Sequence, residues 1–258
     1  MSYERELEAL DNPLVTQFVF YPRRDFTKPP PNATDHFVNV EPGVNIHTRL
    51  YTVDKAAPTI LYFHGNGEVV SDHDDIGPAY NHYGINLFVA DYRGYGASDG
   101  RPTFRAVFAD AHRVLEATVS KLQQLGYSSD LFVMGRSLGS APACELAAGR
   151  PDQLRGLIIE SGFASAVRLL RYLGLPVEVP DRDDLPNLSN IRRITLPALI
   201  MHGEVDNLIP VSEARETYAS LPTDDKRLLI IEDAGHNDIM YIGGRDYFQA
   251  IADFVFGL

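Results

Sequence analysis

The chain has 258 residues, of which 45% are hydrophobic and 22% are charged, and its formal net charge is −12. This composition is typical of a folded protein of one or two domains and excludes a disordered chain, and the acidic balance excludes a general nucleic-acid binder, which needs a cationic surface. The single cysteine excludes a disulfide framework and a cysteine-based zinc or iron–sulfur site, and no apolar run reaches the roughly 18 residues of a transmembrane helix. We therefore expect a cytoplasmic protein with one domain over residues 1–258, and the sequence leaves its oligomeric state open.

The first elements in chain order are a stiff loop and a hairpin. Three consecutive prolines at 29–31 favour extended backbone. Two β-rich pieces follow at 37–40 and 45–53, and Pro42 and Gly43 lie between them. Two such pieces joined by turn residues predict an antiparallel hairpin.

Six short apolar runs then alternate with helical stretches. The runs are continuously apolar, as expected for parallel strands that are covered on both faces, and they lie at 59–63, 86–90, 130–134, 156–159, 197–201 and 227–231. The apolar spacing predicts one long helix at 103–125, which Gly126 ends, and further helices at 138–148, 212–221 and 245–256. Strand and helix in alternation indicate a doubly wound α/β sheet, in which ligands bind at the carboxyl ends of the strands.

One connection is much longer than the others. Residues 163–195 separate two predicted strands and contain one expected short helix at 167–175. A long connection in a compact domain usually has a task, and we interpret this one as a lid. Its apolar side chains either line an acyl pocket or pack against the sheet, and both alternatives stay open: Leu169, Leu170, Tyr172, Leu173, Leu175 and Val177. Arg168 and Arg171 lie three residues apart and could contact a carboxylate or phosphate, but a solvated face is the preferred interpretation.

The pattern Gly-x-Ser-x-Gly occurs twice, centred on Ser98 and Ser137. A nucleophile elbow needs a strand that runs straight into the turn and a helix that leaves it at once. Ser137 has this context, because the run at 130–134 precedes it and the helical stretch at 138–148 follows. Several loop residues separate Ser98 from the preceding run, and no helix follows it. We therefore predict Ser137 as a nucleophile and interpret the glycines around Ser98 as turn residues.

A serine hydroxyl needs a base to take its proton, and the base needs an acid to orient it. In this kind of fold the chain order is serine, acid, histidine, and only two of the eight histidines follow Ser137. His202 directly follows an apolar run, which favours a packed residue. His236 lies in the loop between the last predicted strand and the last helix, so we predict it as the base.

The acid is expected in the loop after the run at 197–201. Asp206 lies deep in this loop, where a turn can direct it toward the histidine, and it is our preferred candidate. Glu204 is expected in solvent and Asp233 on the surface. Glu160, at the end of an earlier strand, remains an alternative acid.

Two backbone N–H groups must stabilise the developing oxyanion. We expect one from Leu138, directly after the nucleophile, and one from Asn66 in the glycine-rich loop that follows the run at 59–63, with Gly67 as the alternative. His64 is expected to brace this loop. Only the amide of Asn66 matters in this interpretation, so its side chain is expected to be free to vary.

Five ordered motifs resemble the α/β-hydrolase superfamily of serine hydrolases, from about residue 12 to the end. They are Leu-Tyr-Phe-His-Gly-Asn-Gly-Glu at 61–68, Asp-Tyr-Arg-Gly-Tyr-Gly-Ala-Ser-Asp-Gly at 91–100, Gly-Arg-Ser-Leu-Gly at 135–139, His-Gly-Glu-Val-Asp at 202–206 and Gly-His-Asn at 235–237. Among its members, the chain looks like the small-lid group near monoacylglycerol lipases and depalmitoylating thioesterases. Phe-Val-Phe-Tyr-Pro-Arg-Arg-Asp at 18–25 is similar to the latter, although we expect neither the cysteine cluster nor the amino-terminal membrane anchor of that group here.

The resemblance implies the α/β-hydrolase fold, a mostly parallel, doubly wound sheet with an amino-terminal antiparallel hairpin and a small lid. The function predicted is hydrolysis of an ester or thioester of a small or acyl substrate through an acyl-enzyme, without a metal or organic cofactor. Asp-His-Asp-Asp at 72–75 is expected to be a solvated helix start rather than a metal site. A peptidase or amidase, a non-hydrolytic lyase and a non-catalytic binding module remain alternatives.

Overall fold

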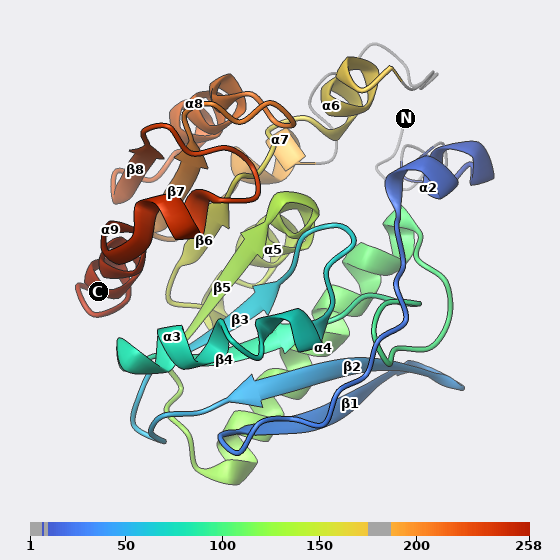
Figure 1. The fold of residues 1–258 in the computed structure, drawn as a ribbon, viewed down its shortest axis with the longest axis vertical. Helices are drawn as coiled ribbons and strands as arrows, with labels where there is room; N and C mark the ends of the chain where they lie inside the picture. The colour runs from blue at the N-terminus through green and yellow to red at the C-terminus, as the bar shows by residue number, and fades with distance from the viewer. Residues whose placement is uncertain (1–6, 8–9, 175–186) are drawn as a thin grey trace.

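The computed structural model describes Leu7, residues 10–174 and residues 187–258, which form an eight-stranded sheet flanked by helices (Figure 1). The strand order is β1-β2-β4-β3-β5-β6-β7-β8. Only the β1–β2 and β2–β4 pairs are antiparallel. The strands are β1 (Ala33–Glu41), β2 (Val44–Tyr51), β3 (Thr59–Phe63), β4 (Asn86–Ala90), β5 (Leu131–Arg136), β6 (Leu157–Glu160), β7 (Ala198–Gly203) and β8 (Lys226–Ile231). The predicted hairpin is confirmed, and each of the six apolar runs overlaps a strand with a parallel neighbour.

Helices cover both faces of this sheet. The described helices are α2 (Pro13–Val19), α3 (Gly77–His82), α4 (Phe104–Leu125), α5 (Ser140–Gly149), α6 (Ala166–Tyr172), α7 (Asn187–Ile191), α8 (Val211–Ser220) and α9 (Ile239–Val255). Residues of α4 and α5 pack in the core on one face, and residues of α3 and α9 pack in the core on the other. The doubly wound architecture expected from the sequence is therefore present.

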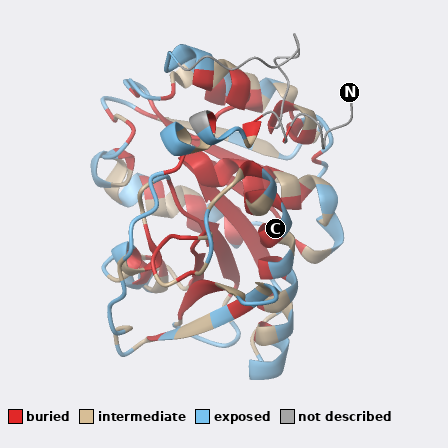
Figure 2. Ribbon diagram, turned by 90° about the vertical axis from the view of Figure 1, so that its right-hand side faces the viewer, coloured by how far each residue is buried: buried red, intermediate tan, exposed pale blue. Residues whose placement is uncertain are grey.

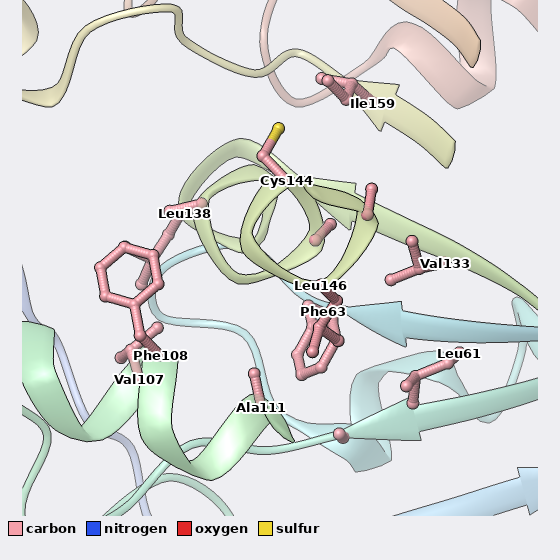
Figure 3. Close-up of a cluster of buried hydrophobic side chains, with 14 of the residues drawn as sticks. Leu61, Phe63, Val107, Phe108, Ala111, Val133, Leu138, Cys144, Leu146 and Ile159 are labelled. Atoms are coloured by element: carbon pink, nitrogen blue, oxygen red, sulfur yellow. The ribbon is translucent and has the colours of Figure 1, made fainter. Parts of the chain in front are cut away.

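Alternate side chains of a strand enter different cores. In β3, Leu61 and Phe63 belong to the core under α4 and α5, whereas Ile60 and Tyr62 belong to the core under α3 and α9. Because successive side chains of a strand point to opposite faces, a strand covered on both sides must be apolar throughout. Figure 3 shows part of the first core, with Leu61 and Phe63 below α5, and Figure 2 shows the buried strands inside the molecule.

The helix boundaries follow local signals where these are strong. Thr103 caps α4, since its hydroxyl accepts a hydrogen bond from the Ala106 N–H at 3.1 Å, and Gly126 ends it in the left-handed region at φ 73°. The last helix predicted at 245–256 corresponds to the second part of α9, whose first part, from Ile239, was not predicted. Gly244, with φ 45° and ψ −119°, interrupts α9 just before the predicted start. The short helices α2, α3 and α7 were not predicted, because seven residues or fewer give no clear helical period.

The parallel arrangement decides where the loops meet. Strands β3 to β8 run in the same direction, so the loops that follow β3, β5, β7 and β8 gather at one edge of the sheet. These are the loops that carry the predicted site residues. In the part of the chain that the structure describes, no helix has the length and apolar character needed to cross a bilayer.

Candidate active site

Ser137 lies at a sharp turn between β5 and α5. Its φ is +51°, in a region that non-glycine residues rarely adopt. A Cβ at Gly135 would lie 2.1 Å from the carbonyl oxygen of Gly139, and a Cβ at Gly139 would lie 2.0 Å from that of Phe63. Both glycines of the motif are therefore sterically required, and the strained turn presents the serine hydroxyl beyond the end of the strand.

Three side chains that are distant in the sequence form one hydrogen-bonded series. His236 Nε2 lies 3.0 Å from Ser137 Oγ, and His236 Nδ1 lies 2.7 Å from Asp206 Oδ2. An ionised carboxylate only accepts, so Nδ1 carries the proton and Nε2 accepts from the serine hydroxyl. The structure thus brings the predicted nucleophile, base and acid together in an arrangement suited to nucleophilic catalysis.

The environment of Asp206 keeps it ionised. Its Oδ1 accepts hydrogen bonds from the backbone N–H groups of Leu208 and Ile209, both at 2.8 Å. Burial disfavours the charged form of the carboxyl group. Hydrogen bonds from His202, His236 and the Ile209 amide have the larger effect and hold the pKa of Asp206 well below its usual range. An ionised Asp206 holds the proton of His236 on Nδ1.

The alternative residues lie elsewhere. Ser98 is buried, and its Oγ accepts a hydrogen bond from the backbone N–H of His47 at 2.9 Å. This contact gives Ser98 a structural role. Glu204 and Asp233 are exposed, as predicted. Glu160 accepts hydrogen bonds from Arg136 and Tyr247 and makes none to the His236 side chain.

His202 is packed at the end of β7, as predicted. It is buried, and its Nε2 lies 2.8 Å from the carbonyl oxygen of Ile209 and 3.3 Å from Asp206 Oδ2. His202 therefore contacts the same carboxylate oxygen of Asp206 as His236 does. This second contact to Asp206 was not predicted.

The two expected oxyanion donors line the same cavity as Ser137. Leu138 directly follows the serine at the start of the helical turn. The backbone N–H of Asn66 donates to none of the other described residues, so it is free for a ligand. His64 braces the loop as predicted, since its Nε2 lies 3.1 Å from Asp91 Oδ1 and its Nδ1 lies 2.8 Å from the carbonyl oxygen of Gly65.

The expectation that the Asn66 side chain is free to vary is wrong. Its Oδ1 accepts hydrogen bonds from the Tyr95 hydroxyl at 2.7 Å and the Tyr21 N–H at 3.0 Å, and its Nδ2 donates to the carbonyl oxygen of Val19 at 2.5 Å. These bonds fasten the segment after α2 to the loop that carries the Asn66 amide. No local signal predicts them, because Tyr21 lies 45 residues away in the sequence.

An apolar cavity of about 490 Å³ opens beside Ser137 and His236. Its apolar lining comes mainly from α2, α6 and the loop after β7, and α2 and α6 lie at the same end of the molecule (Figure 1): Phe18, Val19, Phe104, Phe163, Ala166, Leu169, Leu170, Leu173, Leu208 and Ile209. The segment predicted as a lid thus contributes Leu169, Leu170 and Leu173, whereas Tyr172 is exposed outside the lining. Leu175 and Val177 lie outside the described residues. The contribution of α2 was not predicted.

Two expectations about charged residues are wrong. Arg168 is not simply solvated, because its guanidinium pairs with Glu213 at 2.8 Å and Glu216 at 2.5 Å, which ties α6 to α8. The segment 72–75 is not a solvated helix start, since His73 is buried and Asp74 accepts a hydrogen bond from Arg49 at 2.7 Å. Among the described residues, no group of His, Cys, Asp or Glu side chains is arranged to hold a metal ion.

Comparisons with known proteins identify relatives of this chain. A family model described as serine aminopeptidase, S33, matches residues 54–174. The human α/β hydrolase domain-containing protein 17B is 31% identical over 76% of this chain and 66% of its own length. The chain belongs to the α/β-hydrolase superfamily.

Further similarities extend over most of this hydrolase. An uncharacterised protein of Mycobacterium tuberculosis is 28% identical over 87% of the chain and 80% of its own length. The structure of the esterase Pf2001 of Pyrococcus furiosus, 18% identical, superimposes with a TM-score of 0.74 over 92% of this chain and 98% of that one. The α/β-hydrolase fold predicted from the five motifs is thereby confirmed, and the matched family is one of serine hydrolases.

Proposed function

We propose that this chain is a serine hydrolase that cleaves carboxylic esters or thioesters of apolar acyl groups through an acyl-enzyme. The observation that carries this proposal is the Ser137–His236–Asp206 hydrogen-bonded series beside an apolar cavity. Such a series activates a hydroxyl for acyl transfer. The cavity has the size and character of a site for a small apolar ligand.

The mechanism uses residues of this chain only. His236 Nε2 takes the proton of Ser137 as Oγ attacks the substrate carbonyl carbon, and the amides of Asn66 and Leu138 stabilise the oxyanion. His236 then gives the proton to the leaving alcohol or thiol, whose bond to the acyl carbon breaks. Water, deprotonated by the same nitrogen, cleaves the acyl-enzyme and releases the acid. Asp206 stays ionised throughout and stabilises the imidazolium.

The described lining of the cavity favours an acyl ester over an aminopeptidase substrate. An aminopeptidase must bind the ammonium group of its substrate, for which a carboxylate is the suited partner. The described residues that line the cavity include no Asp or Glu. A substrate that places an apolar chain among Leu169, Leu170 and Phe163 matches what the cavity offers.

The direct test is a fluorophosphonate probe followed by an ester panel. We expect the probe to label Ser137, and a series of 4-nitrophenyl esters from acetyl to decanoyl to show kcat/KM rising with chain length, by up to about fourfold for each methylene that becomes buried. The matched 4-nitroanilides should be much poorer substrates. Absence of labelling, or activity confined to the anilides, would contradict the proposal.

The contribution of α2 to the cavity gives a second prediction. Phe18 lies on α2 at the rim of the cavity and is 59% exposed, so its replacement should leave the fold intact. We expect Phe18→Ala to lower kcat/KM for the octanoyl ester roughly 3- to 10-fold, through lost apolar contact, and to leave the acetyl ester unchanged. Phe37→Ala is the matched control, since Phe37 is 54% exposed on β1 and does not line this cavity. If Phe18→Ala and Phe37→Ala gave the same kcat/KM values on the octanoyl and acetyl esters, α2 would be excluded from the acyl site.

A further inference from the structure

Arg136, the residue before the nucleophile, has a buried side chain that none of the predicted roles uses. It is 9% exposed. Its guanidinium donates hydrogen bonds to three different parts of the chain: the loop after β3, the end of β6, and the loop that carries His236. A planar guanidinium with five fixed donors is suited to such a role, and a lysine ammonium is not.

The first of these contacts holds the loop that carries the Asn66 amide. Arg136 Nη1 donates to Glu68 Oε1, and Glu68 Oε2 accepts the backbone N–H of Gly65 at 2.9 Å. A Cβ at Gly65 would lie 2.5 Å from Arg136 Nη1, so the close approach also explains this glycine. Glu68 thus connects the guanidinium to the residue next to the proposed oxyanion donor.

The second contact holds the loop of the base. Arg136 Nη2 donates to the backbone carbonyl oxygen of His236 at 2.9 Å and to Asn237 Oδ1 at 3.0 Å. The third contact anchors the guanidinium, because Nε donates to Glu160 Oε1 at 3.1 Å and Glu160 Oε2 accepts from the Tyr247 hydroxyl at 2.6 Å. One side chain therefore joins the loops on both sides of Ser137.

Arg136 borders two cavities. One of them has a volume of about 500 Å³, and Glu68, Arg136, Glu160 and Asn237 are among its lining residues. Arg136 and Asn237 also line the cavity beside Ser137. The hydrogen bonds of Arg136 are therefore among the contacts that set the separation of these loops.

We propose that Arg136 is a positioning residue for the hydrolase reaction, which through Glu68 and the His236 carbonyl sets the distance between the Asn66 amide and the imidazole across Ser137. This inference rests on the proposed function, because it assigns no new chemistry to the site. Its consequence is a specific kinetic effect. A misplaced amide or base stabilises the transition state less well, but the apolar binding of the acyl chain is unaffected. We therefore expect kcat to fall while KM stays unchanged.

Glu68→Gln is the most discriminating variant. Arg136 and Gly65 donate to different oxygens of Glu68, and a glutamine replaces one of these oxygens by an NH₂ donor, so one of the two donors loses its acceptor while the guanidinium stays in place. We expect kcat on the octanoyl ester to fall about 10- to 100-fold with KM within about twofold. Arg136→Lys keeps the positive charge beside both carboxylates but cannot reach all of the acceptors, and we expect at least as large a fall.

The control is Asp110→Asn, which makes the same change at an arginine pair away from the site. Asp110 is buried on α4, and its two oxygens accept from Arg93 at 2.7 and 2.8 Å. The melting temperature should fall in all three variants. The value of kcat, normalised to the sites titrated by the fluorophosphonate probe, should fall only in Glu68→Gln and Arg136→Lys.

Two outcomes would overturn the proposal in different ways. If the parent protein is active and both site variants keep its kcat per titrated site, Arg136 only stabilises the fold and the positioning role is wrong. If the parent neither hydrolyses the esters nor reacts with the probe, the proposed function fails, and this inference fails with it. Reduced kcat in Glu68→Gln with unchanged KM and an unaffected control supports the positioning role.

Discussion

Replacing Ser137 by alanine is expected to lower kcat about a million-fold for ester substrates. The hydroxyl is the atom that would form the acyl-enzyme, and without it only the oxyanion donors and the binding of the acyl group remain. The loss corresponds to about 8 kcal/mol of transition-state stabilisation. The measurement is steady-state hydrolysis of the preferred 4-nitrophenyl ester, with the melting temperature as a check on folding.

Ser98→Ala is the matched control for this prediction. Ser98 is the centre of the second Gly-x-Ser-x-Gly string, but its hydroxyl oxygen accepts a hydrogen bond from the His47 N–H of β2. Its removal should cost about 1 kcal/mol of stability and leave kcat unchanged. Parental turnover in purified Ser137→Ala, or loss of turnover in Ser98→Ala alone, would show that the nucleophile has been assigned wrongly.

Asp206→Asn is expected to lower kcat about ten-thousand-fold while the fold stays intact. An asparagine can turn its amide N–H₂ toward His236, which favours the proton on Nε2 and removes the acceptor for the Ser137 hydroxyl. The amide also cannot stabilise the imidazolium. The low pKa of Asp206 predicts that the acid stays ionised well below pH 4, so its own titration should not limit the rate near neutral pH.

Glu204→Gln provides the comparison for Asp206→Asn. Glu204 lies two residues earlier in the same loop and is exposed. It should keep parental kcat and KM. If Glu204→Gln lost activity and Asp206→Asn did not, the orienting acid would have to be reassigned. If kcat fell equally in both variants, the cause would be damage to the loop rather than loss of the orienting acid.

The sequence predicted best the strands that are covered by helices on both faces. The runs at 59–63 and 86–90 coincide with β3 and β4, because a strand covered on both faces must be apolar at every position. The helix α4 was predicted equally well, since Thr103 and Gly126 mark its ends. The sequence did not predict α2 and α3, which have seven and six residues, or the part of α9 that precedes the interruption at Gly244.

Sequence reasoning by itself determined which side chains should carry the chemistry of this chain. The elbow around Ser137 is a local pattern, and the order of Asp206 and His236 follows from the succession of parallel strands, so neither requires coordinates. Only the tertiary structure shows which contacts position the site and which residues line the cavity beside it. The hydrogen-bond partners of the Asn66 and Arg136 side chains lie 24 to 101 residues away, and residues of α2 and α6 line the same cavity. Such contacts depend on how distant loops approach each other at the sheet edge, which no local spacing encodes.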